Sequence, residues 1–225
     1  ADVGARCTRV GGGAPTGAAY VFRRQGAVWV QDGRLLPQST ATAELFGAAV
    51  DVTPGRIIVG APEAGPFGMK TGAVFLYAAG AEGWALESWF SPATPFAHAA
   101  FGAAVAIDGD TAIIGSPGLP GGGGAIFYGV GPEGWAPTGS AAPPLVSGVR
   151  QFGIAVALDG NMALVGARYA SFASGKVNAY RRDPTGVWSA WQAHVGPVEV
   201  ARDGFGRSVR LSGAIAVVGA PADHG

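Results

Sequence analysis

Short apolar runs separated by turn residues recur along the whole chain. Ile57-Ile58-Val59 is one such run, with Pro54-Gly55 before it and Gly60 after it. Comparable runs occupy residues 112–114, 163–165 and 216–218. A short continuous apolar run that is bounded by turn signals is typical of a β-strand buried on both faces. The pattern therefore predicts an all-β protein with many short strands.

The apolar runs belong to a unit of about fifty residues that repeats four times. A Phe-Gly pair precedes each run, and a Gly-Ala-Pro or related triplet follows it. A strand of the Gly-Ala-Val-Phe type comes next, and then a tryptophan. The Phe-Gly pairs begin at Phe46, Phe101, Phe152 and Phe205, and the tryptophans are Trp29, Trp84, Trp135 and Trp188. Repeats of this length are typical of propellers and solenoids.

Each unit divides into four strands. The Phe-Gly strand is followed by a tight turn such as Asp108-Gly109, which is a strong hairpin signal between apolar runs. The apolar run is the second strand, the Gly-Ala-Val-Phe segment is the third, and the fourth starts near the tryptophan. Four antiparallel strands repeated at this period predict the blades of a β-propeller. The small residues after Phe-Gly, such as Ala48-Ala49, suit the innermost strand of a blade.

The repeated Phe-Gly pairs, Gly-Ala-Pro triplets, third strands and tryptophans resemble the FG-GAP repeat. This repeat is the blade unit of the integrin alpha-chain head and of many bacterial surface and secreted proteins. The resemblance covers essentially the whole chain. Gly166-Ala167-Arg168 departs from the Gly-Ala-Pro pattern, and the short turns are of the bacterial type. The resemblance implies a propeller, usually with seven blades, that works in adhesion, ligand binding or extracellular recognition.

We expect one propeller domain over residues 1–225 with about four blades' worth of chain. Its parts are a partial blade over 1–37, blades at about 46–90, 101–142 and 152–195, and a half blade over 205–225. The residues before Pro15 look like the second strand of a preceding blade. A closed four-bladed ring, which is the alternative, would then contain that strand twice. The pattern therefore favours an open arc or a fragment of a larger ring, with seven blades if the resemblance holds.

The turns between first and second strands bear on metal binding. Many FG-GAP proteins carry an Asp-rich calcium loop there, but Asp108-Gly109-Asp110 offers only two carboxylates and the other turns offer fewer. Calcium takes about six to eight oxygen ligands. We therefore expect no calcium site and no other cofactor.

Composition and charge argue against some classes of binding partner. The net charge is +0, so the chain lacks the basic character that nucleic-acid binding requires. Glycine, proline or a charge interrupts every apolar stretch, which argues against direct membrane insertion. Cys7 is the only cysteine, so an intrachain disulfide is excluded. The chain starts at Ala1 without Met, which is expected of a processed protein or a fragment.

Enzyme signatures are weak. The three histidines fall at different positions of different units and suggest no metal cluster. The repeated tryptophans fit either a sugar-stacking platform or blade packing, and their recurrence favours packing. We expect a protein that is not an enzyme. A propeller-scaffold hydrolase or lyase is kept as an alternative.

Residues that break the repeat are the better candidates for ligand contact. Exposed aromatic and Arg side chains on loops are typical binding anchors. The loops between second and third strands contain Phe67, Tyr169 and Phe172, and the loops between fourth and first strands contain Phe96, His98 and Arg150. Both sets are expected to emerge on one face.

The sequence thus predicts an extracellular or cell-surface binding and adhesion module that recognises a protein or a carbohydrate ligand through its loop face. Self-association through open blade edges is a further expectation. The main alternative is a purely structural repeat segment within a large secreted protein.

Overall fold

The computed structural model describes residues 2–6, 17–37, 45–143, 150–169, 175–195 and 204–221. Across these residues it contains seventeen β-strands and one short 3-10 helix, so the all-β prediction is confirmed. The chain divides into two compact units, Ala1–Gly109 and Asp110–Gly225. Each unit is described by itself.

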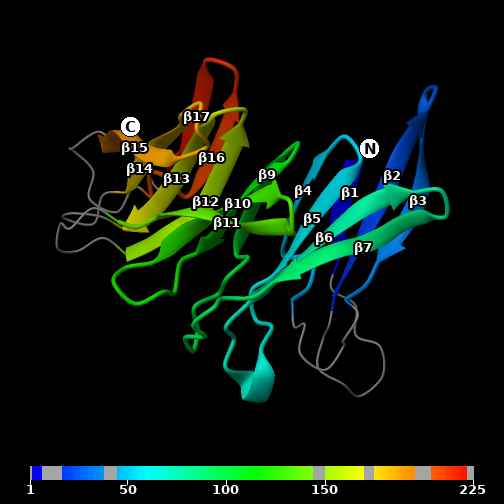
Figure 1. Cartoon of the computed structure of the whole chain (residues 1–225), viewed down its shortest axis with the longest axis horizontal. Helices are drawn as coiled ribbons and strands as arrows, with labels where there is room; N and C mark the ends of the chain where they lie inside the picture. The colour runs from blue at the N-terminus through cyan, green and yellow to red at the C-terminus, as the bar shows by residue number, and fades with distance from the viewer. Residues whose placement is uncertain are drawn as a thin grey trace. The chain divides into compact units, whose positions relative to one another are not determined.

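Unit 1 contains two sheets and the strand that follows them (Figure 1). The first sheet has the order β1-β2-β3, and the second has the order β4-β5-β6-β7. All pairings within the two sheets are antiparallel. The strands are β1 (Asp2–Arg6), β2 (Ala18–Gln25), β3 (Val28–Leu35), β4 (Ala49–Thr53), β5 (Arg56–Ala61), β6 (Ala73–Gly80), β7 (Gly83–Phe90) and β8 (Ala104–Asp108).

Unit 2 continues the same pattern. The third sheet has the order β11-β10-β9-β8, and the boundary between the units falls in the turn after β8. The fourth sheet has the order β12-β13-β14-β15, and β16-β17 form a two-stranded sheet. The strands are β9 (Thr111–Ser116), β10 (Gly124–Gly131), β11 (Gly134–Ala141), β12 (Arg150–Asp159), β13 (Met162–Tyr169), β14 (Lys176–Arg182), β15 (Trp188–Val195), β16 (Ser208–Ser212) and β17 (Ile215–Gly219). Four-stranded antiparallel sheets in sequence order are the predicted propeller blades.

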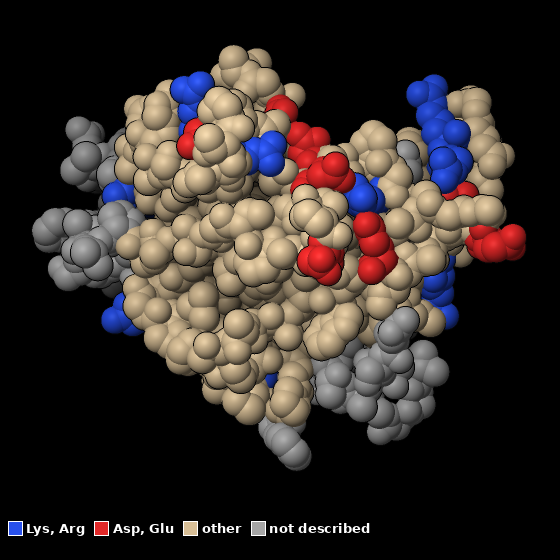
Figure 2. Space-filling model, in the orientation of Figure 1, with Lys and Arg blue, Asp and Glu red and all other residues tan. Residues whose placement is uncertain are grey.

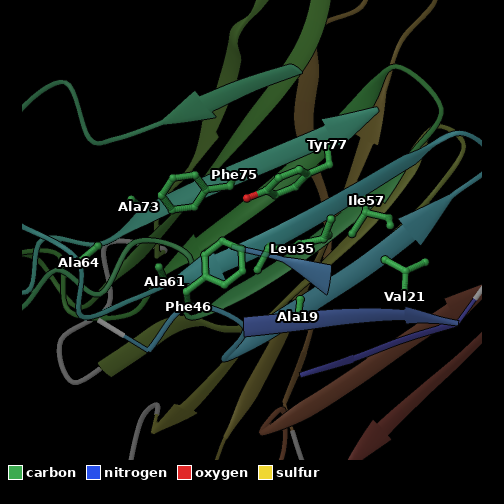
Figure 3. Packing of buried hydrophobic residues seen from close by; sticks show 11 residues of the cluster. Ala19, Val21, Leu35, Phe46, Ile57, Ala61, Ala64, Ala73, Phe75 and Tyr77 are labelled. Carbon is green, nitrogen blue, oxygen red and sulfur yellow. The ribbon is translucent and has the colours of Figure 1, made fainter. Parts of the chain in front are cut away.

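The core of unit 1 lies between its two sheets. Ala19 and Val21 of β2 meet Phe46, Phe75 and Tyr77 in one buried cluster (Figure 3). The rings of Phe46 and Phe75 are 5.3 Å apart and meet edge to face, which is a favoured aromatic geometry. Burying a side chain of this size contributes about 1.5–3 kcal/mol. The period-two alternation of β2 thus directs its small residues towards the next sheet.

The repeated glycines and phenylalanines form the seam between successive sheets. Gly72, which precedes β6, pairs in a parallel bridge with Phe101, and the same bridge joins Gly17 to Phe46. A Cβ atom on Gly72 would overlap the backbone of Phe101. The glycine before the strand thus allows the two backbones to approach closely.

The Phe-Gly pair itself differs from the prediction in one respect. It was expected to begin the first strand, yet β4 begins at Ala49 and β8 begins at Ala104. Phe46 and Phe101 lie before these strands and are fully buried against the preceding sheet. Only β12 includes its phenylalanine, Phe152.

The surface is poor in charge. The charged side chains on the face shown in Figure 2 are outnumbered by uncharged ones, and acidic and basic groups lie among one another there. Within the described residues, no helix is long and apolar enough to span a membrane.

Candidate binding groove

Two loops of unit 1 are held together by main-chain hydrogen bonds. The first connects β5 to β6 and includes the 3-10 helix Pro66–Gly68, and the second connects β7 to β8. The His98 N–H donates to the Met69 carbonyl oxygen at 2.7 Å. Two further bonds run from Ala100 to Lys70 and from Phe101 to Thr71. The two loops therefore lie side by side.

An apolar groove of about 520 Å³ lies beside this loop pair. Its lining includes Pro66, Phe75, Leu86, Trp89, Pro92 and Pro95. Trp89 stands opposite Phe75 in the β6–β7 ladder, so the two side chains are on the same face of the sheet. Trp89 is 59% exposed, although it is one of the largest apolar side chains in the unit. An exposed aromatic ring in a concave apolar setting is typical of a recognition site.

Polar groups are few in the lining. The hydroxyl groups come from Thr71 and Ser91, and the Thr71 hydroxyl already donates to the Ala64 carbonyl oxygen at 3.3 Å. Among the described lining residues no side chain is charged. The Lys70 ammonium, which is near in sequence, is paired with the Glu63 carboxylate at 3.0 Å. The groove therefore offers apolar contact and little hydrogen bonding.

Three predicted contact residues belong to the loop pair of unit 1. Phe96 follows the groove residue Pro95 and is 40% exposed. His98 is exposed, and its φ of 61° places it in the left-handed region that few non-glycine residues adopt. Phe67 lies in the 3-10 helix, and its side chain is outside the described part of the structure.

The other three predicted residues belong to unit 2, and the prediction that they lie in loops is wrong for two of them. Tyr169 is the last residue of β13 and Arg150 is the first residue of β12. The two are paired across the ladder, because this hairpin extends further than its counterparts. Arg150 is exposed, and the side chain of Tyr169 lies outside the described residues. Phe172 lies outside the described residues altogether.

Sequence reasoning missed Trp89, Pro92 and Pro95. Trp89 comes five residues after the repeated Trp84 and has no tryptophan counterpart at that place in the other units. Trp89 departs from the repeat within a strand, whereas the predicted contact residues all lie in expected loops. The excess of proline after β7 was a second signal, because Pro92 and Pro95 cannot continue a ladder.

Two of the repeated tryptophans, Trp84 and Trp188, contact the preceding sheet. The Trp84 indole N–H donates to the Asp32 carboxylate at 3.0 Å. The Arg23 guanidinium also bonds to Asp32, and together these donors hold the pKa of the carboxyl group below its usual range. The Trp188 ring stacks on Phe127 with centroids 4.3 Å apart. These contacts favour the packing interpretation over a sugar platform.

The described residues contain no group of three His, Cys, Asp or Glu side chains that could hold a metal ion. The Asp159 carboxylate, at the turn after β12, accepts a hydrogen bond from the Gly213 N–H at 2.6 Å. A carboxylate of the predicted hairpin turns is thus engaged with the backbone of the next sheet.

The comparison with protein families agrees with the repeat pattern. Residues 29–77, from Trp29 in β3 to Tyr77 in β6, match the family described as FG-GAP repeat. The matched segment includes Phe46, the 60–62 triplet and the third strand β6. A search of curated proteins found no match to the chain.

Proposed function

Because residues 29–77 match the FG-GAP repeat, we propose that the chain is an extracellular binding module without enzymatic activity or cofactor. We propose further that the groove beside Trp89 binds an apolar segment of a partner protein. The observation that carries the proposal is the exposure of Trp89 in an apolar groove of about 520 Å³. Pockets that bind ligands in proteins have similar volumes, from about 300 to 1,000 Å³.

The chemistry of the lining favours a protein segment over a glycan. Sugar recognition needs polar groups beside an aromatic face, and the described lining offers only the hydroxyl groups of Thr71 and Ser91. Apolar side chains, in contrast, need only the Trp, Phe, Leu and Pro surfaces that are present. A peptide with aromatic, aliphatic or proline residues is therefore the occupant that the groove supports best.

The loop pair provides a second zone of contact. Phe96 and His98 are exposed beside Pro95, and the main-chain bonds from His98 and Ala100 fix the path of the loop. A loop that is fixed before binding loses less conformational entropy when the complex forms. We therefore assign Phe96 and His98 to the edge of the site and Trp89 to its centre.

The experiment is a selection with a displayed library of random peptides, alongside an array of immobilised glycans. The proposal expects enriched peptides to carry aromatic, aliphatic or proline residues. Trp89→Ala should weaken their binding by at least about tenfold, because an exposed tryptophan in a pocket is a typical hot spot.

Trp29→Ala is the matched control, since Trp29 is 54% exposed and does not line this groove. It should leave peptide binding unchanged. Equal peptide binding by the Trp89→Ala variant would overturn the site assignment. Binding of glycans alone would overturn the choice of a protein ligand.

A further inference from the structure

The groove beside Trp89 borders the core of unit 1. Phe75 lines the groove but is only 8% exposed, and its ring meets Phe46 in the core. Figure 3 shows Ala64, Ala73 and Phe75 together at one end of this core cluster. All three of these residues line the groove. This part of the lining is therefore close-packed, and its shape is set before any ligand binds.

Main-chain carbonyl groups of the groove lining are already hydrogen-bonded. The Ala64 oxygen accepts from the Gly72 N–H at 2.8 Å and from the Thr71 hydroxyl at 3.3 Å. Because a carbonyl oxygen has two lone pairs, the Ala64 oxygen is fully used. The Pro66 oxygen accepts from the Met69 N–H at 3.1 Å. These lining residues therefore offer few acceptors to the N–H groups of a ligand.

Two side chains of the lining carry hydrogen-bond donors that a ligand can reach. The Trp89 indole N–H can only donate, and it has no acceptor among the described residues. Ser91 is exposed and adds a hydroxyl group. The groove thus presents donors beside an exposed aromatic ring. A ligand with free carbonyl oxygens and few N–H groups matches it best, because a buried N–H without an acceptor is costly.

The regular conformations of a peptide chain match this pattern unequally. The carbonyl oxygens of a helix are occupied by its own hydrogen bonds, so the Trp89 N–H would gain no main-chain acceptor. An added strand needs main-chain partners along an edge, and the segment after β7 contains Pro92 and Pro95, which have no N–H. A polyproline II segment has no internal hydrogen bonds, so its carbonyl oxygens are free, and its prolines bring no N–H.

We propose that the groove binds a proline-rich segment in the polyproline II conformation. This inference rests on the function proposed above, in which the groove is a peptide site, and it names the class of peptide. A proline ring packs on the Trp89 indole, and main-chain carbonyl oxygens of the segment accept hydrogen bonds from the Trp89 N–H and the Ser91 hydroxyl. Such a segment is extended before it binds, so it loses little conformational entropy.

The test measures the binding of fluorescently labelled decaproline to the chain over residues 1–225 by fluorescence anisotropy. A peptide of the same length, in which alternate prolines are replaced by alanine, is the comparison ligand. This second peptide regains N–H groups and loses the fixed backbone conformation. It should therefore bind more weakly than decaproline by about fivefold or more.

Two variants test the donors. Trp89→Phe keeps an aromatic ring but removes the indole N–H, and Ser91→Ala removes the hydroxyl group. Each should weaken decaproline binding by about fivefold, because each loses one hydrogen bond to the ligand. Trp29→Phe is the matched control, since Trp29 is exposed and does not line the groove, and it should leave binding unchanged. All three altered positions are exposed, and circular dichroism checks that the variants fold.

The inference is overturned if decaproline does not bind, if it binds the Trp89→Phe variant as tightly as the parent chain, or if the alanine-containing peptide binds equally well. A proline-free peptide from the library selection separates this failure from that of the proposed function. If such a peptide binds through Trp89 while decaproline does not, the peptide site stands and the proline-rich class is wrong. If neither peptide binds, the proposed peptide site is wrong as well.

Discussion

The Asp159 carboxylate accepts a hydrogen bond of 2.6 Å from the backbone N–H of Gly213, in the first turn of the next sheet. Thr53 holds the same repeat position in unit 1, and its hydroxyl oxygen accepts from the Gly109 N–H at 3.2 Å. The last residue of a first strand thus caps the turn of the sheet that follows. The turn residues therefore help to hold one sheet against the next.

The hydrogen bond between Asp159 and Gly213 predicts that the protein loses stability when the acceptor side chain is removed. Asp159→Ala should lower the free energy of unfolding by about 1 kcal/mol, because a partly exposed hydrogen bond to a charged group contributes about that much. Asp159→Asn keeps an acceptor oxygen and should recover most of the loss. Urea unfolding followed by circular dichroism measures both variants. Equal losses in the two variants would show that the contact with Gly213 is not responsible.

The hydrogen bond between Asp159 and Gly213 also affects the expectation for calcium binding. A carboxylate that bonds to the backbone of the next sheet is not arranged as a loop ligand, and calcium takes about six to eight oxygens. We expect neither excess calcium nor a chelator to shift the midpoint of thermal unfolding, because a ligand that binds only the native state would raise it. A rise with calcium that the chelator reverses would contradict this prediction.

The seam glycines differ from the turn glycines in a testable way. Gly55 and Gly72 both have positive φ, of 81° and 90°. A Cβ atom on Gly55 would meet no atom within 4 Å, whereas one on Gly72 would overlap the backbone of Phe101. Gly55→Ala should therefore cost about 1 kcal/mol of unfolding free energy, which is the backbone penalty alone.

Gly72→Ala should cost clearly more, about 3 kcal/mol or above, because backbone cannot be displaced as cheaply as a side chain. Chemical unfolding of the two variants against the parent protein measures the difference. Equal costs would show that the seam is loose enough to admit a methyl group.

Sequence patterns predicted the blades because each repeated residue has a repeated contact. Phe46 and Gly72 belong to one repeated contact, because the same parallel bridge joins Gly17 to Phe46 and Gly72 to Phe101. The candidate groove was predicted only in part. The loops that border it were identified, but Trp89 was not, because a side chain in a strand is buried or exposed according to what packs on it. The paired strand ends at Arg150 and Tyr169 were missed for a similar reason, since ladder length depends on the partner strand.

Ionisation of buried tyrosines predicts how stability changes at alkaline pH. The Tyr77 hydroxyl donates to the Leu36 carbonyl oxygen at 2.8 Å, and burial raises the pKa of this phenol well above its usual value. The Tyr180 hydroxyl makes the equivalent bond to Ala142, and burial raises its pKa as well. The folded state therefore favours the protonated phenols. This stabilisation is fully present below the unfolded pKa of about 10 and is lost as the pH rises from there towards the folded pKa.

The unfolding free energy of the parent protein should accordingly fall as the pH rises past about 10. Tyr77→Phe loses the bond to Leu36 and should be less stable by about 1 kcal/mol near neutral pH. Phenylalanine does not ionise, so the variant should lose stability less steeply in alkali, and the two curves should converge. Urea unfolding at a series of pH values measures both slopes. Parallel curves would show that Tyr77 ionises as readily in the folded protein as in the unfolded chain.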